Sequence, residues 1–113
     1  MIHEMRLHNE PFNKIKNGTK TIEIRLNDEK RQLIKIGDII EFENRTNKEK
    51  IKVTVINLHK YNNFKELYEA FNKESLGYDI DEIADYKDME KYYSIDEQEK
   101  YGVLGIEICL LNN

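Results

Sequence analysis

The sequence has 113 residues, of which 39% are hydrophobic and 35% are charged, and its formal net charge is −4. This length predicts one domain over residues 1–113 with a single hydrophobic core, and the charge argues against a protein that coats nucleic acid non-specifically. No apolar run approaches the roughly 18 residues of a membrane span, and residues 1–6 lack the apolar core of a signal peptide. We therefore expect a cytoplasmic protein that makes no contact with the membrane.

The two halves of the chain differ in charge. Residues 1–60 contain 13 Lys and Arg against 9 Asp and Glu, whereas residues 61–113 contain 5 against 13. A local basic face on an acidic protein can still take a phosphate, so we expect the ligand on the first half. Acidic side chains on solvated helix faces would produce the same split without any ligand.

Strands separated by short helical segments are predicted for the first half. Hydrophobic alternation favours strands over residues 2–7, after Gly18 to about residue 26, over 39–43 and over 51–55. Asn9 and Pro11 predict the start of a helix that ends at Gly18. Asp28 is a capping residue for a short helical segment that reaches Ile34.

Helices dominate the predictions for the second half. A helix capped by Asn63 and Glu66 should end at Gly77, since its apolar residues are spaced along one face: Phe64, Leu67, Tyr68 and Phe71. A second helix is predicted from residue 79 to residue 93, with three residues facing inward: Ile80, Ile83 and Ala84. A third should begin at Ser94 and end at Gly102. The apolar run at 103–111 predicts a central strand, next or nearly next to the strand at 51–55.

Cys109 is the only cysteine, so an internal disulfide is impossible. It lies in the apolar C-terminal strand and has no cationic neighbour in the sequence. We therefore expect a buried, unreactive thiol rather than a catalytic nucleophile.

The stretch from Gly18 to Arg25 carries a lysine, a glutamate and an arginine within six positions. Side chains two apart in a strand share a face, so Glu23 and Arg25 should lie side by side while the isoleucines between and before them face the core. Lys20 has the wrong parity, and it joins them only if the chain bends near Thr21, after the glycine turn. The same residues also fit a plain exposed strand face with a salt bridge, worth about 0–1 kcal/mol.

The pattern G-x-K-x-x-E-x-R after a short helix resembles the signature of the ASCH domain family, whose members are small relatives of the PUA-like β-barrels. Three landmarks extend the resemblance over nearly the whole chain: the strand and helix over 2–17, the Gly-Asp strand start over 37–42 and the final strand over 101–108. The resemblance implies an α+β, mainly β, fold, namely a PUA-like β-barrel of about five strands with helices packed on the outside. It also favours a functional polar face over a plain exposed one.

Our first hypothesis is RNA or nucleotide binding in a cleft lined by Lys20, Glu23 and Arg25, with Thr21 beside them. Arg25 offers a planar fork for a phosphate, and Glu23 can hold the two cations in place. Several tyrosines can offer a stacking face for a base or simply roof the core: Tyr61, Tyr68, Tyr92, Tyr93 and Tyr101.

A second hypothesis is a small hydrolase that acts on a modified nucleoside or on RNA. Some proteins that this chain resembles hydrolyse N4-acetylated cytidine nucleosides with a Lys, a Thr three residues later and a distal Glu. Lys20 matches that pattern, Glu23 stands where the Thr would be, and Glu74 is the candidate distal carboxylate. The catalytic candidates are therefore Lys20, Glu23 and Glu74. A third hypothesis is a protein-interaction module that uses the acidic half.

We expect neither a metal ion nor a cofactor. His3, His8 and His59 are scattered and show no zinc-ligand spacing. The sequence also has no glycine-rich phosphate loop of the P-loop or dinucleotide type.

Overall fold

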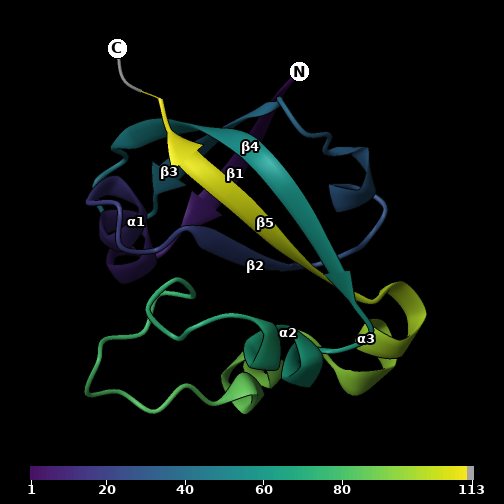
Figure 1. The fold of residues 1–113 in the computed structure, drawn as a ribbon. Helices are drawn as coiled ribbons and strands as arrows, with labels where there is room; N and C mark the ends of the chain where they lie inside the picture. The colour runs from purple at the N-terminus through teal and green to yellow at the C-terminus, as the bar shows by residue number, and fades with distance from the viewer. Residues whose placement is uncertain (112–113) are drawn as a thin grey trace.

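The computed structural model describes residues 1–111 and shows five strands in one strongly curled sheet, a half-barrel (Figure 1). The strands are β1 (Ile2–Leu7), β2 (Ile22–Leu26), β3 (Ile39–Asn44), β4 (Lys50–Tyr61) and β5 (Val103–Leu110). Their order is β1-β3-β4-β5-β2, with β1 parallel to β3 and the other neighbours antiparallel. The expected neighbours β4 and β5 are confirmed. The sheet ends at β1 on one side and at β2 on the other, two strands that the curl brings towards each other.

Short helices lie outside this sheet, as expected. They are α1 (Asn9–Lys16), η1 (Arg31–Leu33), α2 (Phe64–Ala70), η2 (Tyr86–Lys91) and α3 (Ile95–Tyr101). The caps predicted for α2 and α3 are confirmed: the Asn63 side chain accepts from the Glu66 amide, and Ser94 with Glu97 forms a capping box. The cap predicted at Asn9 is wrong, because α1 begins after His8 and its N-cap makes no side-chain hydrogen bond. The α+β fold class, with five strands and external helices, is therefore confirmed.

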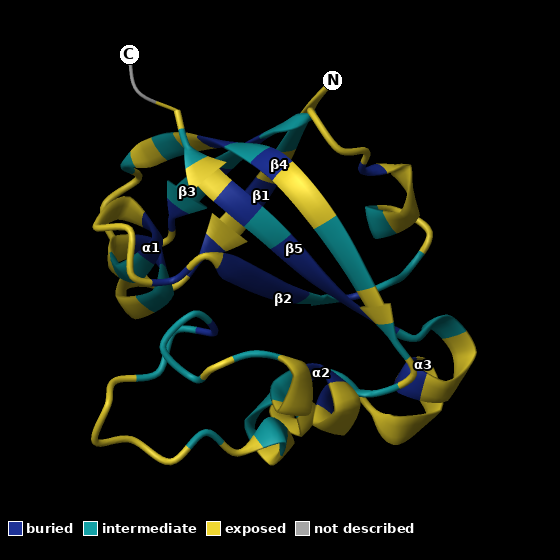
Figure 2. Cartoon of the chain, in the orientation of Figure 1, coloured by how far each residue is buried: buried dark blue, intermediate teal, exposed yellow. Residues whose placement is uncertain are grey.

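Two hydrophobic clusters use opposite faces of the sheet. Figure 2 shows that β2 and much of β5 are buried. Phe42, Val53 and Ile106 belong to the larger cluster, which fills the concave side of the half-barrel and includes residues of α1. Ile22 and Ile24 of β2 point the other way, into a smaller cluster with Phe64 and Leu67 of α2. Because β2 buries its isoleucines under α2, its alternate side chains must face the opposite side.

The predicted helix over residues 79–93 is wrong for its first part. Helical structure occurs there only at η2, and α2 ends at Ala70 rather than near Gly77. Ile80 and Ile83 are 81% and 88% exposed instead of facing inward. This loop is held by polar contacts rather than by a buried apolar face. The Lys73 Nζ donates to the carbonyl oxygens of Ile80 and Glu82, each at 2.6 Å.

The expectation of a buried Cys109 is also wrong. The residue is exposed, because the strand alternation that places Ile108 in the core turns its neighbour outward. In residues 1–111, none of the helices has the length and apolar composition needed to span a bilayer. The last two residues of the expected domain, 112–113, lie outside the described part of the chain.

Candidate functional site

A cavity of about 510 Å³ opens between the two edge strands of the sheet and the segment 64–93. This volume falls in the range of roughly 300–1,000 Å³ typical of small-ligand sites. Arg6 comes from β1, while Glu23 and Arg25 come from β2, and Lys20 precedes that strand. The segment 64–93 supplies the opposite wall, which is rich in tyrosine.

Lys20, Glu23 and Arg25 form one connected ionic group in this cavity. The Lys20 Nζ lies 3.2 Å from the Glu23 Oε1, and the Arg25 Nη2 and Nε lie 2.8 and 3.0 Å from the Glu23 Oε2. The expected pairing of Glu23 with Arg25 on one strand face is confirmed, and so is the bend that lets Lys20 reach them.

Backbone hydrogen bonds to two other segments cause the bend. The strand β2 begins only at Ile22, and the amides of Thr19 and Lys20 both donate to the carbonyl oxygen of Lys14 at the end of α1. The next two amides, of Thr21 and Ile22, donate to the carbonyl oxygen of Ser75. Residues 19–21 are therefore held by α1 and by the loop after α2, and Lys20 is free of the strand's alternation.

The loop after α2 closes over the lysine. The Lys20 Nζ donates to the carbonyl oxygen of Leu76 at 3.2 Å. Gly77 has a φ of +103°, and a Cβ placed there would lie 3.0 Å from the Lys20 Cδ. A glycine is needed here both for the left-handed backbone and for the close approach to the lysine stem.

Burial makes this ionic group electrostatically strong. The side chains of Lys20 and Glu23 are only 8% and 4% exposed. Burial would raise the pKa of the Glu23 carboxyl, but the charges of Lys20 and Arg25 outweigh it and hold that pKa below its ordinary value. Burial likewise opposes the charge on Arg25, and Glu23 more than compensates, so the pKa of Arg25 is raised. Glu23 is therefore a carboxylate that braces two cations, and the group carries a net charge of +1.

Arg25 also joins the two edges of the sheet. Its Nη2 donates to the carbonyl oxygen of Arg6 on β1 at 3.1 Å. The guanidinium thus bridges β2 and β1, which are not neighbours in the hydrogen-bonded sheet.

Tyrosines form the wall that faces this group. The Tyr78 hydroxyl lies 2.8 Å from both the Tyr68 hydroxyl and the Asp88 Oδ2, and burial raises the pKa of Tyr78 and of Tyr68. Tyr92 and Tyr93 line the same cavity, and Tyr92 is 61% exposed. Of the five tyrosines predicted to offer a stacking face, three line this cavity, whereas Tyr61 and Tyr101 line a different groove.

Two of the predicted site residues are placed elsewhere. Thr21 is exposed and Glu74 is half-buried, and neither is among the residues that line the cavity. The sequence analysis also missed Gly77, Tyr78 and Asp88. Nothing in the local pattern marks these three for the site, because Gly77 and Tyr78 fall between the two predicted helices and Asp88 lies in η2, which a contact between distant segments brings to the cavity.

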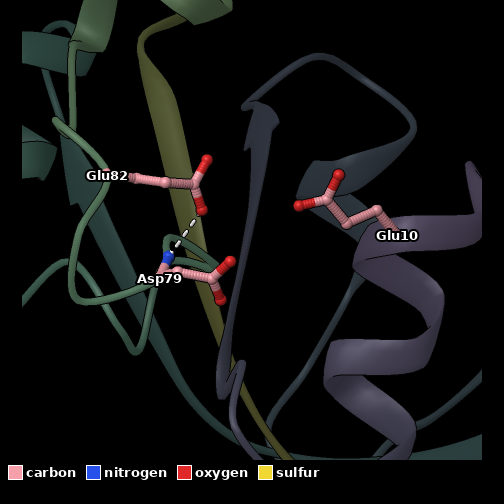
Figure 3. A group of neighbouring side chains, drawn as sticks. All are labelled: Glu10, Asp79 and Glu82. Atoms are coloured by element: carbon pink, nitrogen blue, oxygen red, sulfur yellow. Dashed lines mark hydrogen bonds between the residues drawn. The ribbon is translucent and has the colours of Figure 1, made fainter.

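A cluster of carboxylates lies beside the site, between α1 and the loop after Gly77 (Figure 3). Glu10, Asp79 and Glu82 each bring one oxygen within 4.8 Å of the others, and the Asp79 amide donates to the Glu82 Oε1 at 2.7 Å. The Lys14 Nζ lies 3.1, 3.2 and 3.5 Å from these three carboxylates, so the cluster already contains a cation.

Lys14 fastens this loop to α1. Its Nζ also donates to the carbonyl oxygen of Gly77 at 2.7 Å. Burial would lower the pKa of Lys14, but Glu10 and Asp79 outweigh it and raise that pKa. Glu10 and Lys14 are four residues apart on a helix, a spacing that marks an ion pair in the sequence. The contacts of Lys14 with residues 77–82 cannot be recognised from any spacing in the sequence.

A larger groove of about 800 Å³ lies near α2 and α3, on the other side of the small hydrophobic cluster. The buried Gln98 and several lysines and glutamates line it, and the Gln98 Nε2 has no hydrogen-bond partner among the described residues. Among residues 1–111, this groove is lined by no buried ion pair, so the cavity at Lys20 is the better candidate for a built site.

Comparison with known proteins places the chain in a family. The ASCH domain matches residues 5–111. The crystal structure of hypothetical protein PH0355 is 36% identical, with a TM-score of 0.83 over 98% of this chain and 100% of that one. The solution structure of PF0455 from Pyrococcus furiosus is 37% identical, with a TM-score of 0.72 and full coverage of both chains, 100% each.

A more distant structure supports the fold alone. A mutant of ZmASCH from Zymomonas mobilis is 15% identical, with a TM-score of 0.69 over 98% of this chain and 73% of that one. No curated protein matches the chain.

Proposed function

Because this chain belongs to the ASCH domain family, which is generally associated with RNA binding, we propose that it binds RNA or a nucleotide in the cavity at Lys20, Glu23 and Arg25. The observation that carries the proposal is the buried ionic group with a net positive charge, which opens into a cavity walled by tyrosines. A nucleotide has the two complementary features, an anionic phosphate and a flat base.

The phosphate is assigned to the Arg25 side of the cavity. Glu23 and the Arg6 carbonyl oxygen hold this guanidinium through its Nε and Nη2, so its Nη1 is left to donate to a phosphate oxygen. The Arg25 side chain is therefore already ordered in the free protein, so ligand binding loses little of its conformational entropy.

The base is assigned to the tyrosine side. Tyr92 lines the cavity and is largely exposed, so its ring is available for stacking. Stacking of a base on an aromatic ring is worth about 1–3 kcal/mol and tolerates any base. Sequence preference would then be weak.

The test is fluorescence anisotropy with a labelled single-stranded RNA and a nucleoside monophosphate at several salt concentrations. Affinity should fall steeply with salt, and Arg25→Gln should abolish binding. Tyr92→Ala should weaken binding about tenfold or more without lowering stability, because that side chain is exposed. Lys65→Ala, an exposed change in the other groove, is the matched control and should change nothing. No binding at low salt, or full binding by both cavity variants, would refute the proposal.

A hydrolase is the second candidate, and the direct contact between Lys20 and Glu23 is the observation that favours it. A general base works best with a pKa near the operating pH, however, and both neighbouring cations hold the pKa of Glu23 low. Glu74 does not line the cavity, and a carboxylate stands where the related hydrolases have a threonine. Binding is therefore the function that the geometry supports best.

Turnover separates the two candidates. The wild type is incubated with a panel of acylated nucleosides and short RNAs, and the assay is repeated with Glu23→Gln and Lys20→Ala. For a hydrolase, both variants should lose about 10²–10⁴-fold in rate while retaining affinity. For a binder, no substrate is converted, and affinity falls mainly in the Lys20 and Arg25 variants.

A further inference from the structure

A second recess of about 420 Å³ adjoins the candidate site along the edge strand β1. Arg6, Arg25 and Arg45 line both the recess and the cavity. The two hollows therefore meet at three arginines, and a ligand that leaves the cavity on the Arg25 side enters the recess.

The recess is strongly basic. Three further cations line it, Lys30, Arg31 and Lys50, against three glutamates in all. The Arg6 Nε lies 3.7 Å from Glu43, and the Lys50 Nζ lies 3.7 Å from Glu41. Two of the glutamates are thus paired with cations of the recess, and the charge of the whole lining remains positive.

The remaining cations have spare capacity to bind an anion. Within residues 1–111, no carboxylate oxygen lies within 4 Å of the side-chain nitrogens of Lys30 or Arg45, and both side chains are exposed. Arg31 pairs with Asp28 at 3.2 Å, while its buried Nε has no hydrogen-bond partner among the described residues. An unpaired buried donor is costly unless something satisfies it.

We propose that this recess binds a second phosphate of the ligand that occupies the cavity, an inference that rests on the proposed function. The ligand is then a single-stranded RNA of at least two nucleotides rather than a mononucleotide. One nucleotide occupies the cavity, the chain passes the shared arginines, and the next phosphate lies against Lys30, Arg31 and Arg45. A mononucleotide would leave the recess unused.

The test compares ligands of two lengths and a pair of matched variants. A nucleoside monophosphate and a trinucleotide are titrated into the wild type, into the double variant Lys30→Ala/Arg45→Ala and into the control Lys35→Ala/Lys87→Ala. Both variants remove two exposed positive charges, but Lys35 and Lys87 line neither hollow. The exposed positions make loss of the fold unexpected, and thermal melts of each variant check this.

The expected result is a loss that depends on ligand length. The trinucleotide should bind the wild type more tightly than the monophosphate does. The double variant Lys30→Ala/Arg45→Ala should lower trinucleotide affinity about tenfold or more and reduce the salt slope by about 0.7 for each lost phosphate contact. It should lower monophosphate affinity by much less, because Lys30 lines only the recess whereas Arg45 also lines the cavity, and the control should leave both ligands unchanged.

Other outcomes would overturn the proposal in distinguishable ways. Equal affinities for the two ligands, or equal losses in the variant and its control, would refute the second phosphate site and leave the cavity as a mononucleotide site. Absence of binding for both ligands would refute the proposed function and this inference together.

Discussion

Replacing Lys20 by methionine tests whether the ionic group is a buried interaction or a surface one. Methionine keeps much of the lysine stem that packs under Gly77 but removes the charge. The Glu23 Oε1 then retains only the amide of Ile24, at 3.2 Å, whereas its Oε2 keeps Arg25. A carboxylate that is 4% exposed would have lost one of its two cations.

The expected cost follows from this geometry. Removing one partner of a buried ion pair costs about 3–5 kcal/mol, because the other charge is left uncompensated. Arg25 stays in place, so we expect the lower end, about 3 kcal/mol. For a domain of this size that corresponds to a fall in the melting temperature of roughly 12 °C.

The measurement is denaturant unfolding of a double-mutant cycle formed by Lys20→Met, Glu23→Gln and the combination. Removing both charges leaves no carboxylate without its partner, so the double variant should be less destabilised than the sum of the singles by about 1–3 kcal/mol. Lys16→Met is the matched control. It makes the same change in an exposed ion pair with Glu49 and should cost less than about 1 kcal/mol.

Two results would refute this reasoning. One is a Lys20→Met variant that costs no more than Lys16→Met. The other is additivity of the two single variants, which would mean that Lys20 and Glu23 do not interact in the folded protein.

Three further predictions follow from the surroundings of the site. Gly77→Ala should lower stability by more than about 1–2 kcal/mol and weaken RNA binding, since it adds crowding against Lys20 to backbone strain. Gly37 has a similar φ of +94°, but a Cβ placed there would meet no atom within 4 Å. Gly37→Ala is therefore the control, and calorimetric melts should show only the cost of backbone strain. Equal losses of stability in the two variants would contradict the predicted crowding at Gly77. Lys14→Met should speed amide hydrogen exchange at residues 77–82, because three carboxylates and a carbonyl oxygen lose their common donor; unchanged exchange would show that the loop does not depend on this lysine. Asp38 has a pKa lowered from 3.8 to about 2, chiefly by a hydrogen bond from a histidine, so its contribution to stability is complete above pH 3.8 and is lost as the pH falls through 2. Asp38→Asn should therefore flatten the fall in melting temperature between pH 4 and pH 2, and an unchanged pH profile would contradict the assigned pKa.

The sequence predicts correctly those structural features that depend on a single helix or strand. The pairing of Glu23 with Arg25 follows from the two-residue period of a strand, and the starts of α2 and α3 follow from their capping residues. The strand β5 was recognisable because it is apolar on both faces. These features depend on neighbours in the sequence, so local patterns are sufficient to predict them.

The predictions that failed concern features that depend on contacts between distant segments of the chain. Ile80 and Ile83 have helical spacing, yet Lys73 binds the carbonyl oxygens of Ile80 and Glu82 in an open loop. The approach of Gly77 to Lys20 joins residues 57 positions apart, a contact that no local period can indicate. The parity rule left the position of Lys20 undecided, since the bend that frees it is set by the carbonyl oxygens of Lys14 and of the distant Ser75.

The strand order has a consequence for the time at which the site forms during synthesis. The β2 strand pairs only with β5 among the described strands, and β5 is the last of these strands to be made. A nascent chain that has released residues 1–101 can pair β1, β3 and β4, but it has no partner for the strand that carries Glu23 and Arg25. Because non-local pairing must wait for both segments, the site cannot assemble until β5 is available. Ligand binding should therefore begin only after β5 has left the exit tunnel.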